Sequence, residues 1–367
     1  MTDELAAPAP TSRPVSMGRL KSLDLARGIA MVFVVVIHVL EQLSAAKVKE
    51  SLFGGVLNMG TSICAAAMFM FLMGTGLSFS KTTSLTKGIL RGVGLLAIAY
   101  LLNLLRGTFP TWVGLATHQF TLEQLQPYSP LYVTFEIDIL HFAGIALILL
   151  AVLRHVTKKW VVWLIAAVAV LAVSPLVFGQ TTRSVIGDYF INFLWRTEEY
   201  GHFPVFPWLT YPLMGMVFGT LMKNTNNQNV FFVKSATIGV LLGICGGYMA
   251  YNYTDFSFAS WMSGEYNEGA VHPWLVVCEI GALLISISFY QFVALRVPWN
   301  RAFEWLSVWS KNVTVMYCMQ WIVIGWIVIF ITEYFGYIGT LVSMLVVFIV
   351  THYAGLGWVR ITSGWKK

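Results

Sequence analysis

The chain has 367 residues, of which 57% are hydrophobic and 11% are charged, and its mean hydropathy is +0.71. A soluble globular domain has about 25% charged residues, so this composition excludes a soluble enzyme, a disordered protein and a nucleic-acid-binding domain. The formal net charge of +6 is therefore expected to orient loops at a membrane, with no nucleic acid as partner.

The chain divides into a polar tail and a long series of apolar stretches. Residues 1–20 are rich in Pro, Ala, Ser and Thr and predict a disordered cytoplasmic tail. Residues 21–358 predict an all-α polytopic membrane domain, because ten apolar stretches are each long enough to cross a bilayer as a helix. Residues 359–367 are expected to form a cytoplasmic C-terminal tail. The ten stretches cover about residues 25–45, 57–79, 89–106, 133–153, 160–179, 204–222, 229–251, 272–296, 312–332 and 336–356.

The distribution of Lys and Arg predicts the orientation of these spans. Ten spans place both termini on one side, and 18 of the 23 basic residues lie in the tail, the even-numbered loops and the C-terminus. Basic loops face the cytoplasm, so both termini are predicted to be cytoplasmic. The long loops at about 107–132, 180–203 and 252–271 then face outward, where a water-soluble ligand would be met. We expect a plasma or inner membrane as the location.

The first apolar stretch carries most of the ionisable residues of interest. Arg27 and His38 are 11 residues apart, which is within about 20° of three whole helical turns, so both side chains project from one face about 16 Å apart. Asp24 and Gln42 fall on the same stripe, and Glu41 is close to His38. Ionisable groups inside a membrane are costly and are candidates for function. A helix-start ion pair of Asp24 with Arg27, and a His38 that hydrogen-bonds a neighbouring helix, are the structural alternatives.

The fourth stretch has a similar pattern. Asp138 and His141 are separated by three residues and are expected on one helical face, with Glu136 on another side. The depth of His141 in the membrane is expected to match that of His38. A carboxylate that accepts from an imidazole nitrogen raises the basicity of the other nitrogen, so these residues predict a proton-handling pocket. A structural polar contact between helices is the alternative.

Other polar residues give weaker signals. His202 and Trp208 precede and begin the sixth stretch, where they either bind substrate or form a rigid interfacial segment. Glu279 and His352 are single polar residues that are expected to pack against helices or pore water. The four cysteines each lie in an apolar run, with no C-x-x-C pair, and predict neither a disulfide framework nor a metal site.

Several segments together resemble a known family. RLKSLDLARGIAMVFVVVIHV is similar to the opening of the integral-membrane acyltransferases related to heparan-α-glucosaminide N-acetyltransferase, and Arg27 and His38 fit the R-x10-H pattern of the type-3 membrane acyltransferases. The later blocks MFMFLMGTGLSFS, DILHFAGIALILL, FPVFPWLTYPLMGMVFG and WSKNVTVMYCMQW are similar in order, although Met319 stands where relatives often have His. The resemblance implies transfer of an acyl group, often acetyl from acyl-CoA, to a glycan hydroxyl or amine. It places Arg27 on the donor side and makes His38 the catalytic histidine.

We therefore expect a membrane acyltransferase that uses acyl-CoA, in the first instance acetyl-CoA, and no metal. His38 is expected to act as general base or acyl carrier, and Arg27 to bind the CoA phosphates. The expected partners are the lipid bilayer and an acceptor, which is a glycan or another molecule with a hydroxyl or amine group. A homodimer is compatible with the sequence. The remaining site residues are expected to be Asp24, Asp138 and His141 for catalysis and Glu41, Gln42, His202 and Trp208 for substrate binding.

Two other functions are weighed against this one. A proton-coupled secondary transporter or flippase would use Glu136, Asp138, His141 and Glu279 as a proton relay. A catalytically silent sensor or assembly protein with the same fold would tolerate replacement of His38 without any phenotype.

Overall fold

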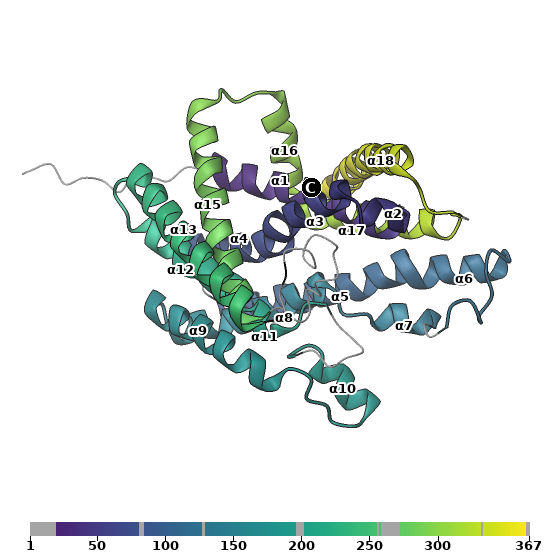
Figure 1. The fold of residues 1–367 in the computed structure, drawn as a ribbon, viewed down its shortest axis with the longest axis horizontal. Helices are drawn as coiled ribbons and strands as arrows, with labels where there is room; N and C mark the ends of the chain where they lie inside the picture. Colours follow the sequence, from purple (N-terminus) through teal and green to yellow (C-terminus); the bar gives the residue numbers. More distant parts are fainter. Residues whose placement is uncertain are drawn as a thin grey trace, which may run out of the picture.

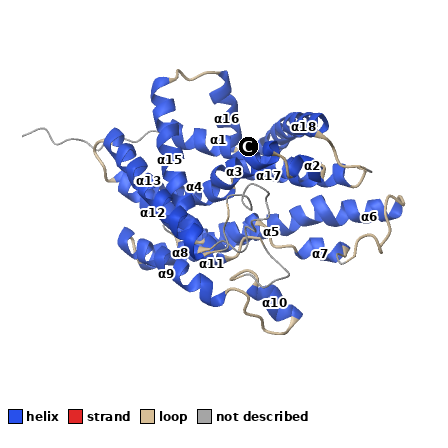
Figure 2. Cartoon of the chain, in the orientation of Figure 1, coloured by secondary structure: helices blue, strands red, loops and turns tan. Residues whose placement is uncertain are grey.

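The structure, a computed structural model, describes residues 20–80, 84–126, 129–195, 202–254, 257, 272–331 and 333–364. Within these ranges the chain is helical, and the described part contains no strand beyond an isolated bridge between Ser44 and Phe335 (Figure 2). This confirms the all-α prediction. The predicted tail at 1–20 lies outside the described residues except for Leu20.

Nine helical segments of the described chain are long and apolar enough to cross a membrane. They coincide with the first eight predicted stretches and the tenth, which confirms a polytopic membrane protein. The predicted stretch 312–332 contains a shorter helix, α17 (Val313–Val328), whose 16 residues span about 24 Å at a rise of about 1.5 Å per residue. The sidedness of the termini depends on whether α17 crosses the membrane, so their cytoplasmic placement stays a prediction.

The first helix, α1 (Lys21–Leu43), lies at the centre of the packing. It contacts α3, α4, α15, α16, α17 and α18, and in Figure 1 it lies between α12 and α13 on one side and α18 on the other. This position buries a large part of α1 inside the bundle, including the polar residues Ser22 and Asp24, whereas Glu41 and Gln42 near its C-terminal end are exposed. The other helices are α2 (Ala46–Lys49), α3 (Leu52–Cys64), α4 (Ala66–Phe79), α5 (Leu85–Asn103), α9 (Trp160–Val177), α10 (Val185–Ile191), α11 (Val205–Trp208), α12 (Thr210–Lys223), α13 (Gln228–Tyr253), α15 (Pro273–Arg296), α16 (Arg301–Lys311) and α18 (Tyr337–Gly364).

The third spanning segment extends further than predicted. After α5 the chain continues through a five-residue π-helix, η1 (Leu104–Thr108), into α6 (Phe109–Ala116). Residues 107–116, which we predicted as the start of an outward loop, are therefore helical. A π-helical turn adds a residue within a helix and re-aims the side chains there, which is frequent at functional sites.

The fourth spanning segment is interrupted, and the prediction of one continuous helix is wrong at this point. It consists of α7 (Pro130–Phe135) and α8 (Ile139–Val156), separated by residues 136–138. Asp138 is extended (φ −120°, ψ 174°), and its carboxylate accepts a hydrogen bond of 2.6 Å from the backbone N–H of Ile139. The break occurs because Asp138 caps α8 and is not part of its first turn.

The outer faces of the bundle are apolar. Large hydrophobic side chains such as Leu90, Ile98, Ile165 and Ile244 are exposed along the spanning helices. An aqueous protein rarely exposes contiguous apolar faces of this kind, whereas a bilayer covers them. At the C-terminus, α18 runs to Gly364, six residues beyond the predicted boundary of the membrane domain at 358.

Candidate functional site

Two cavities inside the bundle meet at the same side chains. The first, which we call the Arg27 cavity, has a volume of about 470 Å³ and is lined by Arg27, Lys311 and residues of α1, α4, α5 and α8. The second, the Arg106 cavity, has a volume of about 640 Å³ and is lined by Arg106, Glu136, Gln42 and His202 among others. Residues lining both cavities are His38, Glu41, Asp138 and Phe203.

Arg27 and His38 are placed on one cavity, as their spacing predicts. Both side chains line the Arg27 cavity from α1, which is the central helix. An Nη2 of Arg27 donates to the carbonyl oxygen of Leu72 on α4 at 3.1 Å, so the guanidinium is held against the cavity wall. Lys311, the last residue of α16, adds a second cation to the same cavity.

Asp24 does not reach this cavity. Its carboxylate accepts a hydrogen bond of 3.1 Å from the hydroxyl of Ser310 on α16 and lies 3.8 Å from Nη1 of Arg27. The side chain is buried and lines neither the Arg27 cavity nor the Arg106 cavity. Its observed contacts are those of a helix-start ion pair that fastens α1 to α16.

His38 is held by residues of α17. Its Nδ1 lies 2.8 Å from Nε2 and 3.2 Å from Oε1 of the Gln320 amide, and its ring centroid is 4.0 Å from that of Trp321. When Nε2 of Gln320 donates to Nδ1, the ring proton is on Nε2 of His38, whereas an Nδ1–H that donates to Oε1 of Gln320 leaves Nε2 of His38 as the proton acceptor. The amide of Gln320 therefore decides which ring nitrogen of His38 can act as a base.

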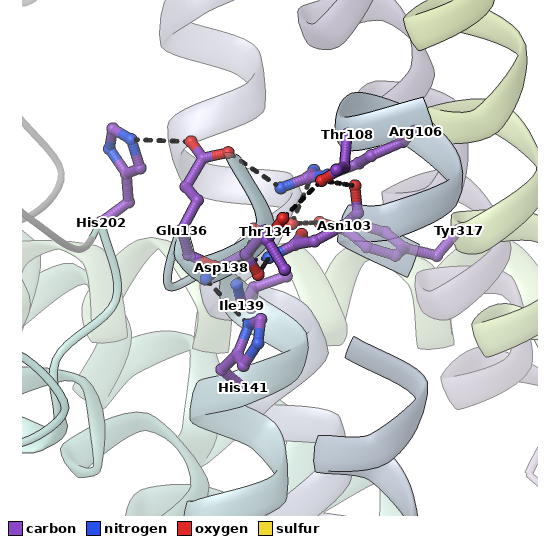
Figure 3. Close-up of polar contacts among 10 residues, drawn as sticks. All are labelled: Asn103, Arg106, Thr108, Thr134, Glu136, Asp138, Ile139, His141, His202 and Tyr317. Carbon is purple, nitrogen blue, oxygen red and sulfur yellow. Dashed lines mark hydrogen bonds and ion pairs between the residues drawn. The ribbon is translucent and has the colours of Figure 1, made fainter. Parts of the chain in front are cut away.

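Asp138 belongs to a buried ion-pair network centred on Arg106 (Figure 3). Nη1 of Arg106 lies 2.9 Å from Oδ2 of Asp138, and Nη2 lies 3.3 Å from Oε2 of Glu136. The hydroxyl of Tyr317 donates to Oδ2 of Asp138 at 2.8 Å, and the Arg106 guanidinium lies 4.4 Å from the ring centroid of Trp321. The Arg106 residue is 7% exposed, so this charge cluster is inside the bundle.

The irregular backbone around this network is satisfied by neighbouring side chains. Nδ2 of Asn103 donates to the carbonyl oxygens of Thr134 at 3.1 Å and Glu136 at 2.8 Å, which the helix break would otherwise leave without partners. The hydroxyls of Thr108 and Thr134 are 2.6 Å apart and join η1 to α7. Non-helical backbone at membrane depth is tolerated where it is paired in this way and lines a cavity.

His141 is not paired with a carboxylate, which contradicts the predicted Asp138–His141 arrangement. Its Nδ1 accepts a hydrogen bond of 3.2 Å from the backbone N–H of Asp138, and together these residues form a capping box at the start of α8. Because Asp138 lies before the helix, its carboxylate turns toward Arg106 and Tyr317 and away from the imidazole, as Figure 3 shows. His141 lines neither of the two cavities.

The remaining predicted residues divide into two groups. His202, whose side chain is 57% exposed, lines the Arg106 cavity together with Gln42, and its Nε2 lies 3.8 Å from Oε1 of Glu136. Trp208 is buried among the rings of Phe142, Phe203 and Tyr211, and it lines neither cavity. Glu279 accepts a hydrogen bond from Tyr211 and also lies away from both cavities. Trp208 and Glu279 therefore do not lie with His38 where the two cavities meet.

Four residues of this site were missed from the sequence. They are Arg106, Tyr317, Gln320 and Trp321. Arg106 is the last residue of the predicted stretch 89–106 and is not among the predicted site residues, although it lies in η1 and is buried. A glutamine inside an apolar run, such as Gln320, is the signal that marks α17 as facing another polar group.

The described residues contain no group of three or more His, Cys, Asp or Glu side chains placed to hold a metal ion. The fold and the cavities define a multi-pass membrane protein with a polar site enclosed by its helices. The family described as heparan-alpha-glucosaminide N-acetyltransferase, catalytic, matches residues 19–253, which is more than half of the chain. The chain therefore belongs to this family of membrane acetyltransferases, and the resemblance seen in the sequence is confirmed. Among curated proteins, no similar sequence was found.

The matched region contains Arg27, His38, Arg106 and Asp138. The α17 residues that contact them lie beyond residue 253, so the site combines the matched region with helices outside it.

Proposed function

We propose that this protein transfers an acetyl group from acetyl-CoA on the cytoplasmic side to an amine or hydroxyl of a glycan or similar acceptor on the opposite side. The observation that carries the proposal is that His38 lines two cavities at once. One cavity leads to Arg27 and Lys311, and the other leads to Gln42 and His202. A group that reacts with ligands arriving from opposite sides has to lie at such a junction. In this scheme both termini lie in the cytoplasm, and the protein is located in a plasma or inner membrane.

The Arg27 cavity suits the donor. CoA is a polyanion, and a guanidinium binds phosphate oxygens bidentately in a way that an ammonium does not. Arg27 and Lys311 supply cations at one end of the cavity, while apolar side chains such as Met73 and Leu95 line its wall. This combination fits a ligand with a charged end and a long, thinner arm that reaches toward His38.

The Arg106 cavity suits the acceptor. Glu41, Gln42 and His202 line it with groups that hydrogen-bond hydroxyls or amines, and Trp321 offers an aromatic ring. The family description names a glucosaminide as the molecule on which that enzyme acts, and a glucosaminide carries both an amine and hydroxyls.

His38 acts by one of two routes. As general base, its unprotonated nitrogen takes a proton from the acceptor while the acceptor nitrogen or oxygen attacks the thioester carbonyl carbon and the CoA thiolate leaves. As acyl carrier, the same nitrogen attacks the carbonyl carbon first and expels the CoA thiolate. The acceptor then attacks the acetyl-imidazole carbonyl, and the released imidazole takes the acceptor's proton. Both routes need the His38 orientation that Gln320 and Trp321 impose.

The test uses the purified full-length protein in nanodiscs with radiolabelled acetyl-CoA and glucosamine as the acceptor probe. We expect His38→Ala to lower the rate of transfer by about 10²–10⁴, the usual contribution of a positioned general base or nucleophile. His155→Ala removes an exposed imidazole at the end of α8 and is the matched control, with unchanged transfer expected. Equal labelling by wild type and His38→Ala would remove His38 from the mechanism. A burst of CoA release from acetyl-CoA in the absence of acceptor, of about one CoA per protein, distinguishes the two routes, because only the acyl carrier expels CoA before the acceptor reacts.

A transporter is the second candidate, and the interrupted fourth segment favours it. Discontinuous helices with charged residues at membrane depth are typical of secondary transporters, and Glu136 and Asp138 lie at this break. Proton uptake by proteoliposomes without any turnover of acetyl-CoA would support the transporter over the acetyltransferase.

A further inference from the structure

A third, smaller cavity lies between the N-terminal end of α5 and the C-terminal end of α8. It has a volume of about 30 Å³ and is lined by three basic side chains, Lys87, Arg91 and Arg154, together with Ser84 and four apolar or small residues. Ser84 caps α5, and its hydroxyl accepts from the backbone N–H of Lys87. We call this the Arg91 cavity.

No Asp or Glu lies close in sequence to the three basic residues of the Arg91 cavity. The sequence contains no Asp or Glu from residue 80 to 122 or from residue 139 to 187, and these ranges include all of α5, α8 and α9. Among the described residues, Lys87, Arg91 and Arg154 also form none of the ion pairs within 4.0 Å. The N-terminal end of α5 adds its partial positive charge, so the potential in this cavity favours an anion.

One of these cations is fixed in place. Arg154 is partly buried, and its Nη2 donates to the carbonyl oxygen of Ser80 at 3.2 Å, which ties the end of α8 to the end of α4. Lys87 and Arg91 are exposed on α5 and face the same cavity. A basic side chain that snorkels only extends toward water at the membrane surface. Lys87, Arg91 and Arg154 instead come from two helices, α5 and α8, and line one cavity between them.

The size and depth of the Arg91 cavity restrict what it takes. A volume of about 30 Å³ holds a group of a few atoms and not a whole organic molecule. The three cations lie at the ends of spanning segments, where the phosphates of a bilayer lie. We propose that the Arg91 cavity is a binding site for a single phosphate group of a larger ligand.

Two ligands present such a phosphate here. The first is a phospholipid head group. The second is the nucleotide end of acetyl-CoA, because the linings of the Arg27 cavity and the Arg91 cavity are about one helical turn apart along α4, α5 and α8. Met73, Leu95 and Ala143 line the Arg27 cavity, and residues four positions away on the same helices, Leu77, Arg91 and Leu147, line the Arg91 cavity. The second source rests on the proposed function, whereas the first does not.

The experiment measures equilibrium binding to the full-length protein in detergent, without turnover. The probes are phosphatidylglycerol, phosphatidylcholine, CoA and 3′-dephospho-CoA. The test variant is Lys87→Gln with Arg91→Gln. The matched control is Lys158→Gln with Lys159→Gln, which removes the same charge from the exposed loop between α8 and α9, outside the cavity lining. Melting temperatures of both variants verify that they are folded.

We expect the test variant to weaken binding of one phosphate ligand by about tenfold or more, as for the loss of charge-assisted hydrogen bonds, while the control stays within about twofold of wild type. A loss confined to phosphatidylglycerol assigns the phosphate to a lipid. A loss for CoA that 3′-dephospho-CoA does not share assigns it to the 3′-phosphate of the donor. The proposal is overturned if the test variant and the control bind all four probes equally well. It is also overturned if the wild type binds none of the probes. A wild type with no acetyl transfer, whose phosphatidylglycerol binding still depends on Lys87 and Arg91, refutes the proposed function and leaves the phosphate site standing.

Discussion

Replacing Arg106 with Gln tests whether the buried ion pair with Asp138 holds the interrupted fourth segment in place. The two charged groups are 2.9 Å apart, and at an effective dielectric constant of about 20 two such charges attract by about 6 kcal/mol. Much of this attraction is offset by the loss of hydration of both groups. Removal of one partner, however, leaves the other charge buried, and such changes cost about 3–5 kcal/mol. We therefore expect Arg106→Gln and Asp138→Asn each to lower the free energy of unfolding by about 3–5 kcal/mol.

The assay is a double-mutant cycle on unfolding by SDS in mixed micelles, followed by far-ultraviolet circular dichroism. The double variant Arg106→Gln with Asp138→Asn has no unpaired charge at this pair, so its loss should be smaller than the sum of the single losses by about 2–3 kcal/mol. Arg360→Gln removes an exposed cation of α18 and should stay within about 0.5 kcal/mol of wild type. A coupling free energy below about 0.5 kcal/mol would refute the reasoning, because the two groups would then act independently.

Three further predictions concern packing and the proposed chemistry. A Cβ added at Gly74 overlaps the carbonyl oxygen of Pro212 where α4 meets α12, so Gly74→Val should lower the free energy of unfolding by about 1–3 kcal/mol. The control is Gly94→Val, whose Cβ meets no described atom within 4 Å and which should change SDS unfolding little. Gln320→Leu should lower kcat for acetyl transfer by about 10–100-fold with a smaller change in KM, because His38 loses the amide that orients its ring; an unchanged kcat would show that this amide is dispensable. Arg27→Gln should raise KM for acetyl-CoA by about tenfold and Arg27→Lys by less, and equal KM values for all three proteins would place the donor phosphates elsewhere.

Much of the fold is predictable from the sequence because a bilayer imposes a simple rule. Backbone groups in hydrocarbon have to bond within their own helix, so each spanning segment is an apolar run of a certain length. Nine of the ten predicted stretches coincide with such helices. The shared face of Arg27 and His38 follows from helical periodicity in the same way, and both side chains line one cavity.

The break before α8 left a sequence signal that periodicity alone does not use. Asp138 is followed three residues later by His141, which is the spacing of a capping box, and this spacing marks a helix start as well as a shared helical face. We interpreted the pair as neighbours on one face, so the predicted carboxylate–imidazole contact was wrong. The capping interpretation would have placed the carboxylate outside the helix.

The sequence by itself determined the spanning helices, the family and the face of α1 that carries Arg27 and His38, because these depend on local periodicity and composition. Tertiary structure alone decided that Gln320 holds His38, that Arg106 pairs with Asp138, and that Asp24, His141 and Trp208 lie off the cavities. Partners such as Gln320 and His38 are 282 residues apart. Which of them meet depends on which helices pack around α1 and where a segment breaks, and neither is encoded in the spacing of residues along a single helix.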